Sequence, residues 1–171
     1  MTKYILAYLS MILTLMTLAA CGGGGGGGTT VYTTATVKIA LDGTLPANTA
    51  IIGTVFTLAL PADVIPAMTS GVVANGVVTP SGTFAGGILT PPIYTPATAS
   101  AAGSLQIAMV NPNPSGITLA GEVATITLLL SSGAAPTISS FSLDTVGVNV
   151  IDTVGNPISG MKAVVSGLQL H

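Results

Sequence analysis

Apolar and polar residues alternate along residues 31–42, "VYTTATVKIALD". The apolar positions on one side are interrupted only by Thr33, and they are Val31, Ala35, Val37, Ile39 and Leu41. Successive side chains of a β-strand point to opposite faces of the sheet, so a period of two indicates a strand with one buried face. The pattern predicts that the folded part of the chain opens with such a strand.

Several later segments have the same character. Residues 50–60, "AIIGTVFTLAL", are β-branched and apolar on both sides, which is typical of a central strand. Residues 72–78, "VVANGVV", centre on Asn75-Gly76, a dipeptide that favours a hairpin turn. Residues 103–110 and 121–130 predict two more strands, separated by a cluster of Asn, Pro, Ser and Gly.

Residues 137–152 and 160–170 complete the pattern, with a turn predicted at 154–157. Residues 79–100 are rich in Pro, Gly and Thr and predict irregular edge strands and loops. Eleven prolines and the lack of a 3.6-residue period argue against a long helix. Seven to nine short strands separated by regular turn signals predict an all-β, two-sheet antiparallel β-sandwich.

The first 20 residues follow a different pattern. Lys3 precedes a nearly uncharged stretch that runs to Leu18, and the small residues Ala19 and Ala20 follow. This is the layout of a secretory signal peptide. A membrane-spanning helix needs about 20 apolar residues and usually a basic flank, whereas this stretch is slightly short and polyglycine follows it. We therefore expect residues 1–20 to be removed.

The only cysteine lies at the end of this segment. Leu18-Ala19-Ala20-Cys21 resembles the lipobox of bacterial lipoproteins. The resemblance implies that Cys21 becomes the first residue of the mature protein and carries two or three acyl chains, palmitate among them. The alternative is a free structural cysteine, but a lone thiol in an exported chain has no intramolecular disulfide partner. Gly22, where Asp would favour inner-membrane retention, implies the outer membrane under the enteric sorting rule.

Seven glycines, 22–28, follow the cysteine. Such a run behaves as a flexible coil of about 15 Å and predicts a tether. A phosphate-binding glycine loop would need a preceding strand, a following helix and a suitably spaced lysine or serine, which this sequence lacks. The chain therefore divides into a signal peptide (1–20), an acylated cysteine with its tether (21–30) and a β-sandwich domain (31–171).

Charged and aromatic residues are scarce in the predicted domain. Two lysines stand against five acidic residues, a formal charge of about −3, so a basic face for nucleic acid is excluded. Aromatic side chains stack on sugars and anchor many interfaces. Since tryptophan is absent, a glycan platform would depend on Tyr32 or Tyr94.

Three segments carry a family resemblance: "SLQIAMVNPN", "ITLAGEVATITLLL" and "FSLDTVGVNVIDTVGNPISG". In this order they resemble the C-terminal half of cohesin-like domains, and the whole resemblance spans residues 31–168. It implies a nine-stranded jelly-roll sandwich, shared with certain carbohydrate-binding modules, and a role in binding. The family's "G-D-x-V-x-V-P-V" pattern is missing around residues 43–52, and no dockerin-contacting residue can be matched, so dockerin binding itself is not implied.

Candidate chemistry is limited. His171, the only histidine, is the last residue, where fraying makes it a poor base or ligand, and no serine or cysteine has another histidine to activate it. The oxygen-bearing residues Asp144, Asn149, Asp152 and Asn156 suggest a weak calcium alternative. The competing interpretation is that Asp152 and Asn156 only complete a turn. We expect no catalytic residue, cofactor or metal.

These features predict a cell-envelope lipoprotein, anchored in the outer membrane by lipid, that presents a non-catalytic cohesin-like domain to a protein or polysaccharide. The alternative is a structural or accessory lipoprotein of an envelope assembly, such as a secretion or filament system. An enzyme is disfavoured.

Overall fold

The alternating segment forms the first strand, β1 (Thr34–Asp42). Its inward residues Ala35, Val37, Ile39 and Leu41 are buried, while the residues between them are partly exposed. Val31, which the pattern placed on the same face, precedes the strand and is 59% exposed. The alternation was therefore predicted correctly from residue 34 onward, where pairing with neighbouring strands begins.

The structure is a computed structural model that describes residues 30–144 and 149–171. Residues 31–171 form one compact unit. The predicted signal peptide, Cys21 and the glycine tether lie outside the described residues. Within the described residues, no helix is both long enough and apolar enough to cross a membrane.

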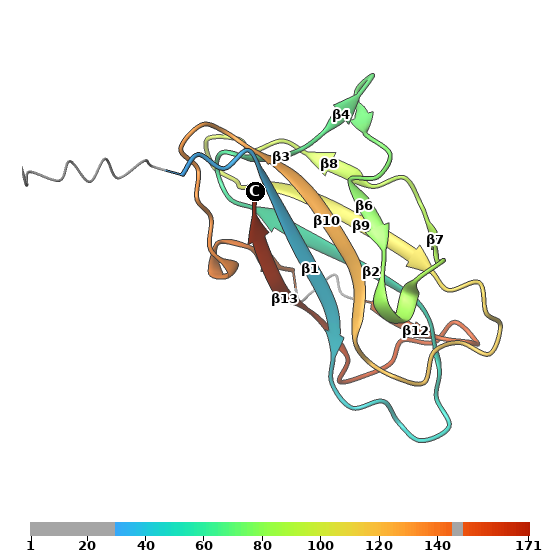
Figure 1. The fold of residues 1–171 in the computed structure, drawn as a ribbon. Helices are drawn as coiled ribbons and strands as arrows, with labels where there is room; N and C mark the ends of the chain where they lie inside the picture. The colour runs from blue at the N-terminus through green and yellow to red at the C-terminus, as the bar shows by residue number, and fades with distance from the viewer. Residues whose placement is uncertain (1–29, 145–148) are drawn as a thin grey trace, which may run out of the picture. The chain divides into compact units, whose positions relative to one another are not determined.

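Strands are distributed between two antiparallel sheets (Figure 1). Sheet A has the order β13-β1-β10, and two short strands share the far side of β10. Its other members are β10 (Glu122–Leu130), β13 (Lys162–Leu170), β3 (Val64–Pro66) and β6 (Val78–Pro80).

Sheet B is built around two long strands, β2 (Ile51–Leu60) and β9 (Gly103–Val110). The free side of β2 pairs with β11 (Ser142–Leu143) and β12 (Asn149–Asp152). The free side of β9 pairs with β7 (Ile88–Leu89) and β8 (Ile93–Thr95). The prediction of a two-sheet antiparallel sandwich is confirmed.

The described residues contain thirteen strand segments, more than the expected nine. Three of the four sheet edges are each made of two short segments that lie end to end along one neighbouring strand. The five long strands and these three shared edges therefore amount to eight strand positions in the two sheets. The remaining pair, β4 (Met68–Thr69) and β5 (Val72–Val73), forms a separate hairpin. The prediction of short, irregular structure over residues 79–100 is confirmed, with β6, β7, β8 and the 3-10 helix η2 (Gly82–Phe84) in this region.

The hairpin turn was predicted at the wrong dipeptide. The hairpin closes at Ser70-Gly71, where both residues have positive φ, 52° and 84°, as a type I′ turn requires. Gly76 also has positive φ, 85°, but the turn at Asn75-Gly76 links β5 to β6, which belong to different sheets. The prediction of a turn at Asn75-Gly76 is therefore confirmed. The prediction of a hairpin there is wrong, because β5 and β6 do not pair with each other.

Residues 137–152 also differ from the expected strand. Their first part is the 3-10 helix η3 (Ile138–Ser140). The Oγ of Ser140 accepts a hydrogen bond from the Thr137 amide at 3.0 Å, so a side chain satisfies a backbone group that a strand would have paired. Only β11 and β12 are strands here, and residues 145–148 lie outside the described residues.

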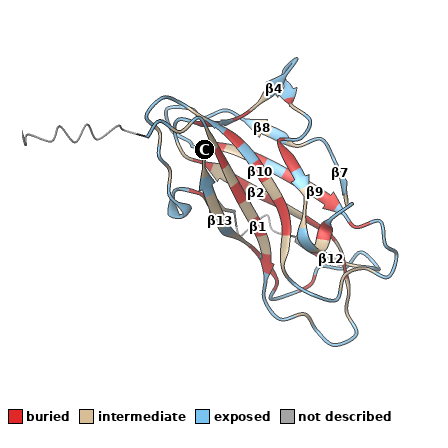
Figure 2. Ribbon diagram, viewed as in Figure 1, coloured by how far each residue is buried: buried red, intermediate tan, exposed pale blue. Residues whose placement is uncertain are grey.

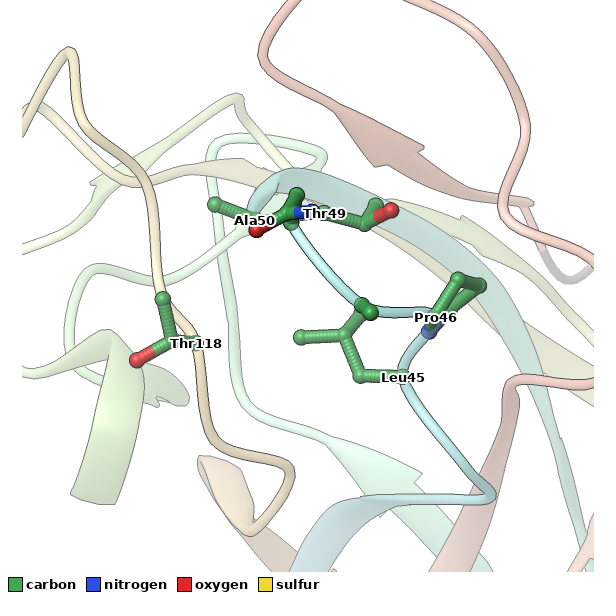
Figure 3. Close-up of a pocket in the computed structure, with 7 residues that line it drawn as sticks. Leu45, Pro46, Thr49, Ala50 and Thr118 are labelled. Atoms are coloured by element: carbon green, nitrogen blue, oxygen red, sulfur yellow. The ribbon is translucent and has the colours of Figure 1, made fainter.

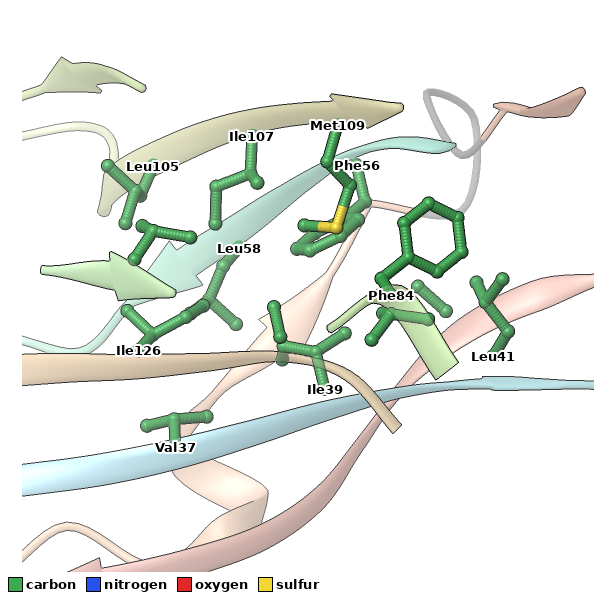
Figure 4. Close-up of a cluster of buried hydrophobic side chains, with 14 of the residues drawn as sticks. Val37, Ile39, Leu41, Phe56, Leu58, Phe84, Leu105, Ile107, Met109 and Ile126 are labelled. Atoms are coloured by element: carbon green, nitrogen blue, oxygen red, sulfur yellow. The ribbon is translucent and has the colours of Figure 1, made fainter. Parts of the chain in front are cut away.

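The core lies between the sheets (Figures 2 and 4). Phe56 and Leu58 of β2 face Ile39 of β1 and Ile126 of β10, and all four are fully buried. Phe84 of η2 is also fully buried and lies beside this cluster. Because β2 and β9 supply one side of the core and β1 and β10 the other, the central strands hold the sandwich together.

Thr54 of β2 is a polar exception inside this core. It is 1% exposed, and its hydroxyl has no hydrogen-bond partner among the described residues. A buried unsatisfied hydroxyl costs about 1–3 kcal/mol, so Thr54→Val should raise the free energy of unfolding by about 1 kcal/mol in urea denaturation. Thr57→Val, on the outward side of the same strand, should change it by less than about 0.5 kcal/mol. Equal effects of the two substitutions would contradict the unsatisfied hydroxyl.

Candidate binding surface

The outer face of sheet B combines apolar side chains with uncharged polar ones. Inward residues of β2 pack in the core, and its outward residues Val55, Thr57 and Ala59 are only partly buried. They pair with Ala108, Gln106 and Ser104 of β9. Within the described ranges the strands of sheet A cover only the inner face of sheet B, and η2 and η3 lie against β10 and β13. The β4–β5 hairpin contacts sheet B at its β8 edge. A strand apolar on both faces thus has one face without a covering layer.

Three large aliphatic side chains extend this surface toward the β7–β8 edge. Ile88 is 61% exposed, Ile93 is 60% exposed and Val110 is 41% exposed. The register places Ile88 beside Val110 and Ile93 beside Gln106. None of β2, β7, β8 and β9 contains a charged residue. We call this surface the neutral face, and its members are Val55, Thr57, Ala59, Ile88, Ile93, Ser104, Gln106, Ala108 and Val110.

The two candidate sugar-stacking tyrosines do not belong to the neutral face. Tyr94 of β8 pairs with the inward residue Leu105 and packs partly against the core. Tyr32 precedes β1 of the other sheet and is half-buried. The described phenylalanines, Phe56, Phe84 and Phe141, are buried. The large hydrophobic side chains exposed on the neutral face are therefore aliphatic and not aromatic, a composition that suits another protein better than a pyranose ring.

The opposite sheet carries the main charged cluster. Lys38 Nζ lies 3.0 Å from Glu122 Oε2, and Ser81 Oγ donates to Glu122 Oε1 at 2.8 Å. Thr125 Oγ1 lies 3.4 Å from the same carboxylate oxygen. The Ser81 hydrogen bond, followed by the hydrogen bond from Lys38, lowers the pKa of Glu122. Every member already has a partner within the cluster, so its evident role is to join β1, β10 and the segment after β6.

A pH dependence follows from this lowered pKa. The folded state favours the charged carboxylate, so its contribution is present above the ordinary pKa of 4.5 and is lost as pH falls through the lower folded value. Lys38 is 43% exposed and Glu122 30%, so solvent screening limits the effect to about 1 kcal/mol. In urea titrations, wild type should exceed Glu122→Gln by about this amount at neutral pH. The difference should shrink below pH 4.5, and a constant difference down to acid pH would be the contrary result.

Asp152 and Asn156, two of the four candidate calcium ligands, complete a turn, as the competing interpretation expected. Asp152 Oδ1 accepts hydrogen bonds from the amides of Val154 at 3.0 Å and Asn156 at 2.8 Å. These bonds, that of Asn156 first, lower the pKa of Asp152. The amide of Asp144 donates to the Thr57 carbonyl at 3.0 Å, and the side chain of Asn149 lies outside the described residues. No described group of three His, Cys, Asp or Glu residues could hold a metal.

His171 is held more firmly than expected. Its amide donates to the Thr34 carbonyl at 2.9 Å, and its carbonyl accepts from the Thr34 amide at 3.1 Å. The expectation of a frayed end is therefore wrong for the backbone, because the residue continues the pairing of β13 with β1. The end of the chain and the start of β1 lie side by side (Figure 1).

A shallow hollow of about 590 Å³ lies at the end of the sandwich away from His171 (Figure 3). It is formed by the loop between β1 and β2, together with Thr118. Its lining residues are Leu45, Pro46, Ala47, Asn48, Thr49, Ala50 and Thr118. None of these side chains ionises, so the hollow offers no general acid or base.

Cys21, the one predicted modification site, lies outside the described residues, and its lipidation stays a prediction. Comparisons of this chain with protein-family models, curated proteins and solved structures give no match. The neutral face was not predicted from sequence. Its signal was the two-sided apolar character of residues 50–60, which was attributed only to a central position in a sheet.

Proposed function

We propose that this chain is an outer-membrane lipoprotein whose cohesin-like sandwich binds a partner protein, without catalysis, through the neutral face of sheet B. The observation that carries the proposal is the set of exposed aliphatic side chains of Ile88, Ile93 and Val110, on strands of sheet B that contain no charged residue. Contiguous apolar surface of this kind is typical of interaction sites.

The anchor part of the proposal rests on the sequence around Cys21 and its glycine tether. Two or more acyl chains hold a protein stably at a membrane, since each buried methylene contributes about 0.8 kcal/mol. The chain enters the sandwich at the end where β1 begins, and His171 lies at the same end. A tether of the kind that the glycine run predicts would, at that end, leave the lateral sheet faces free to meet a partner.

The non-catalytic part is supported by the chemistry of the candidate surfaces. The side chains of the neutral face and of the hollow near Leu45 cannot ionise, and the carboxylates of Glu122 and Asp152 are engaged in structural hydrogen bonds. Such surfaces favour burial of apolar area over acid-base chemistry. The cohesin-like part of the proposal rests on the sequence resemblance, and the two antiparallel sheets support only its sandwich architecture.

Two matched substitutions test the proposed face. Val110 in β9 and Leu129 in β10 are both 41% exposed aliphatic residues on central strands, but they lie on opposite sheets. Val110→Asp should reduce capture of the partner from cross-linked envelope fractions at least tenfold, equivalent to about 1.4 kcal/mol, while Leu129→Asp should leave it unchanged. Equal capture by both variants would reject the neutral face as the binding site.

A glycan array with the wild-type protein separates the two partner classes. Because the large hydrophobic side chains exposed on this surface are aliphatic, we expect the array to show no bound glycan. We expect the capture experiment to yield one defined protein partner. Glycan binding that survives Val110→Asp would reject the protein-binding proposal. The captured protein would also distinguish an assembly component, as in a secretion or filament system, from a soluble ligand.

A further inference from the structure

The four edges of the sandwich differ sharply in continuity. The edge formed by β3 and β6 is interrupted by the β4–β5 hairpin and contains Pro66 and Pro80. The edge formed by β7 and β8 is interrupted by Pro91 and Pro92. The edge formed by β11 and β12 has segments of two and four residues. Short, proline-containing or interrupted edges resist pairing with another chain.

The fourth edge, β13, has none of these interruptions. It runs for nine residues without proline and forms the outer strand of sheet A (Figure 1). In the described part of the chain, its backbone pairs only with β1. β11 and η3 also lie against β13, but among the described residues neither forms a backbone hydrogen bond with it. Its single charged residue, Lys162, stands at its first position. A long edge with no charge beyond its first residue is a template for addition of another strand.

The pairing with β1 identifies which backbone groups of β13 point to the open edge. Thr33 accepts from Leu130, and Leu41 donates to Gly121, so odd-numbered residues of β1 bond toward β10. Even-numbered residues therefore bond toward β13, as the reciprocal bonds of Thr34 and His171 show. The β13 partners of these even-numbered residues are Lys162, Val164, Gly167 and Gln169.

A bulge at Ser166 shifts the alternation within β13. The register changes between Lys38 and Ile39, and the Ser166 hydroxyl donates to the Lys38 carbonyl at 3.2 Å. The residues between those bonded to β1 direct their amides and carbonyls, in the plane of the sheet, toward the open edge of β13. We call these residues the outward set because of their backbone groups, not their side chains. Apart from the bulge, they are Ala163, Val165, Leu168 and Leu170.

The outward set is complementary to itself in an antiparallel arrangement. When Ala163 is placed opposite Leu170 of a second copy, Val165 falls opposite Leu168, and the same pairs repeat across the two-fold axis. The bulges of the two copies then lie beside each other at the axis, so the register is kept on both sides. Lys162 falls opposite His171 of the second copy, which avoids contact between the two lysines.

We propose that β13 is a self-association edge and that its occupant is β13 of a second copy of this chain, paired antiparallel in this register. Because the other described edges are interrupted, the association closes at two copies and does not propagate into a fibre. Two A sheets become one continuous sheet, and the neutral faces on the B sheets stay free. The inference depends on residues 31–171 alone and is independent of the lipid anchor.

Cysteine cross-linking tests the register. Val164 and Gln169 lie on the outer side of sheet A and face each other across the proposed two-fold axis, in a non-hydrogen-bonded pair with Cα atoms about 4.5 Å apart. That separation permits a disulfide. Within one copy the same residues are about 17 Å apart along the strand, which forbids one.

The full chain in intact native cells should form a disulfide-linked dimer under mild oxidation when it carries Val164→Cys and Gln169→Cys together, whichever cell fraction holds it. Each single substitution should give only background dimer, and these single variants also control for Cys21. Absence of the dimer in the double variant, or equal dimer in the single variants, would overturn the proposal.

A charge at the axis provides the second test. Ser166 is exposed, and two copies of Ser166→Lys would bring like charges together at the axis. Added to the double-cysteine chain, Ser166→Lys should abolish the cross-link, whereas Thr79→Lys on the opposite edge should leave it unchanged. A cross-link that survives Ser166→Lys would contradict pairing through β13.

Discussion

Replacement of Phe56 by alanine is expected to lower the free energy of unfolding by about 3–5 kcal/mol. The ring comes from the centre of β2, is fully buried and lies between the two sheets (Figure 4). Its removal leaves a cavity that rigid neighbours such as Ile39 and Ile107, both fully buried, can only partly fill. Since domains of this size are stable by about 5–15 kcal/mol, the loss is a large part of the total.

Urea denaturation followed by circular dichroism measures this effect. Thr57→Ala is the matched control, because it changes the next residue of β2 but points outward, and it should cost less than about 1 kcal/mol. Equal costs for the two substitutions would mean that the sheets do not pack around β2. Substantial helical signal in the wild-type spectrum would contradict the sandwich itself.

Cys21→Ser is expected to have the largest effect on location. In the proposed anchor the thiol carries the diacylglycerol, so its removal should eliminate the anchoring energy of about 0.8 kcal/mol per buried methylene. The mature-sized protein should disappear from the membrane fraction, and incorporation of labelled palmitate should fall to background. Fractionation with immunoblotting and metabolic labelling give the two measurements.

Gly22→Asp is the matched control for this substitution. It changes the neighbouring residue but keeps the thiol, so the protein should stay in the membrane fraction and remain labelled. If Cys21→Ser leaves a membrane-bound protein of normal mature size, the anchor proposal fails. If Gly22→Asp also abolishes labelling, the loss with serine cannot be assigned to the thiol.

The long strands could be predicted from sequence because their alternation is tied to burial. Residues 103–110 and 121–130 were predicted almost to the residue as β9 and β10. Breakers with defined chemistry, such as the cluster at 111–116, mark the strand ends. In this region local pattern and tertiary packing agree, so periodicity alone is sufficient.

The remaining differences arise where distant contacts decide the structure. Asn75-Gly76 has the better local turn signal, but β6 pairs with β10, so the hairpin closes at Ser70-Gly71 instead. His171 is ordered by Thr34, which is far away in sequence. The neutral face could not be found from residues 50–60 because sequence does not show which side of a strand a second sheet covers.

The central claim of the account is a lipid-anchored sandwich, and the mass of the mature N-terminal peptide tests it most directly. Protein extracted from the outer membrane and digested should yield an N-terminal peptide that begins at Cys21 and carries a diacylglyceryl group, with residues 1–20 absent. An N-terminal peptide that retains residues 1–20, or one that begins at or beyond Cys21 without lipid, would contradict the account.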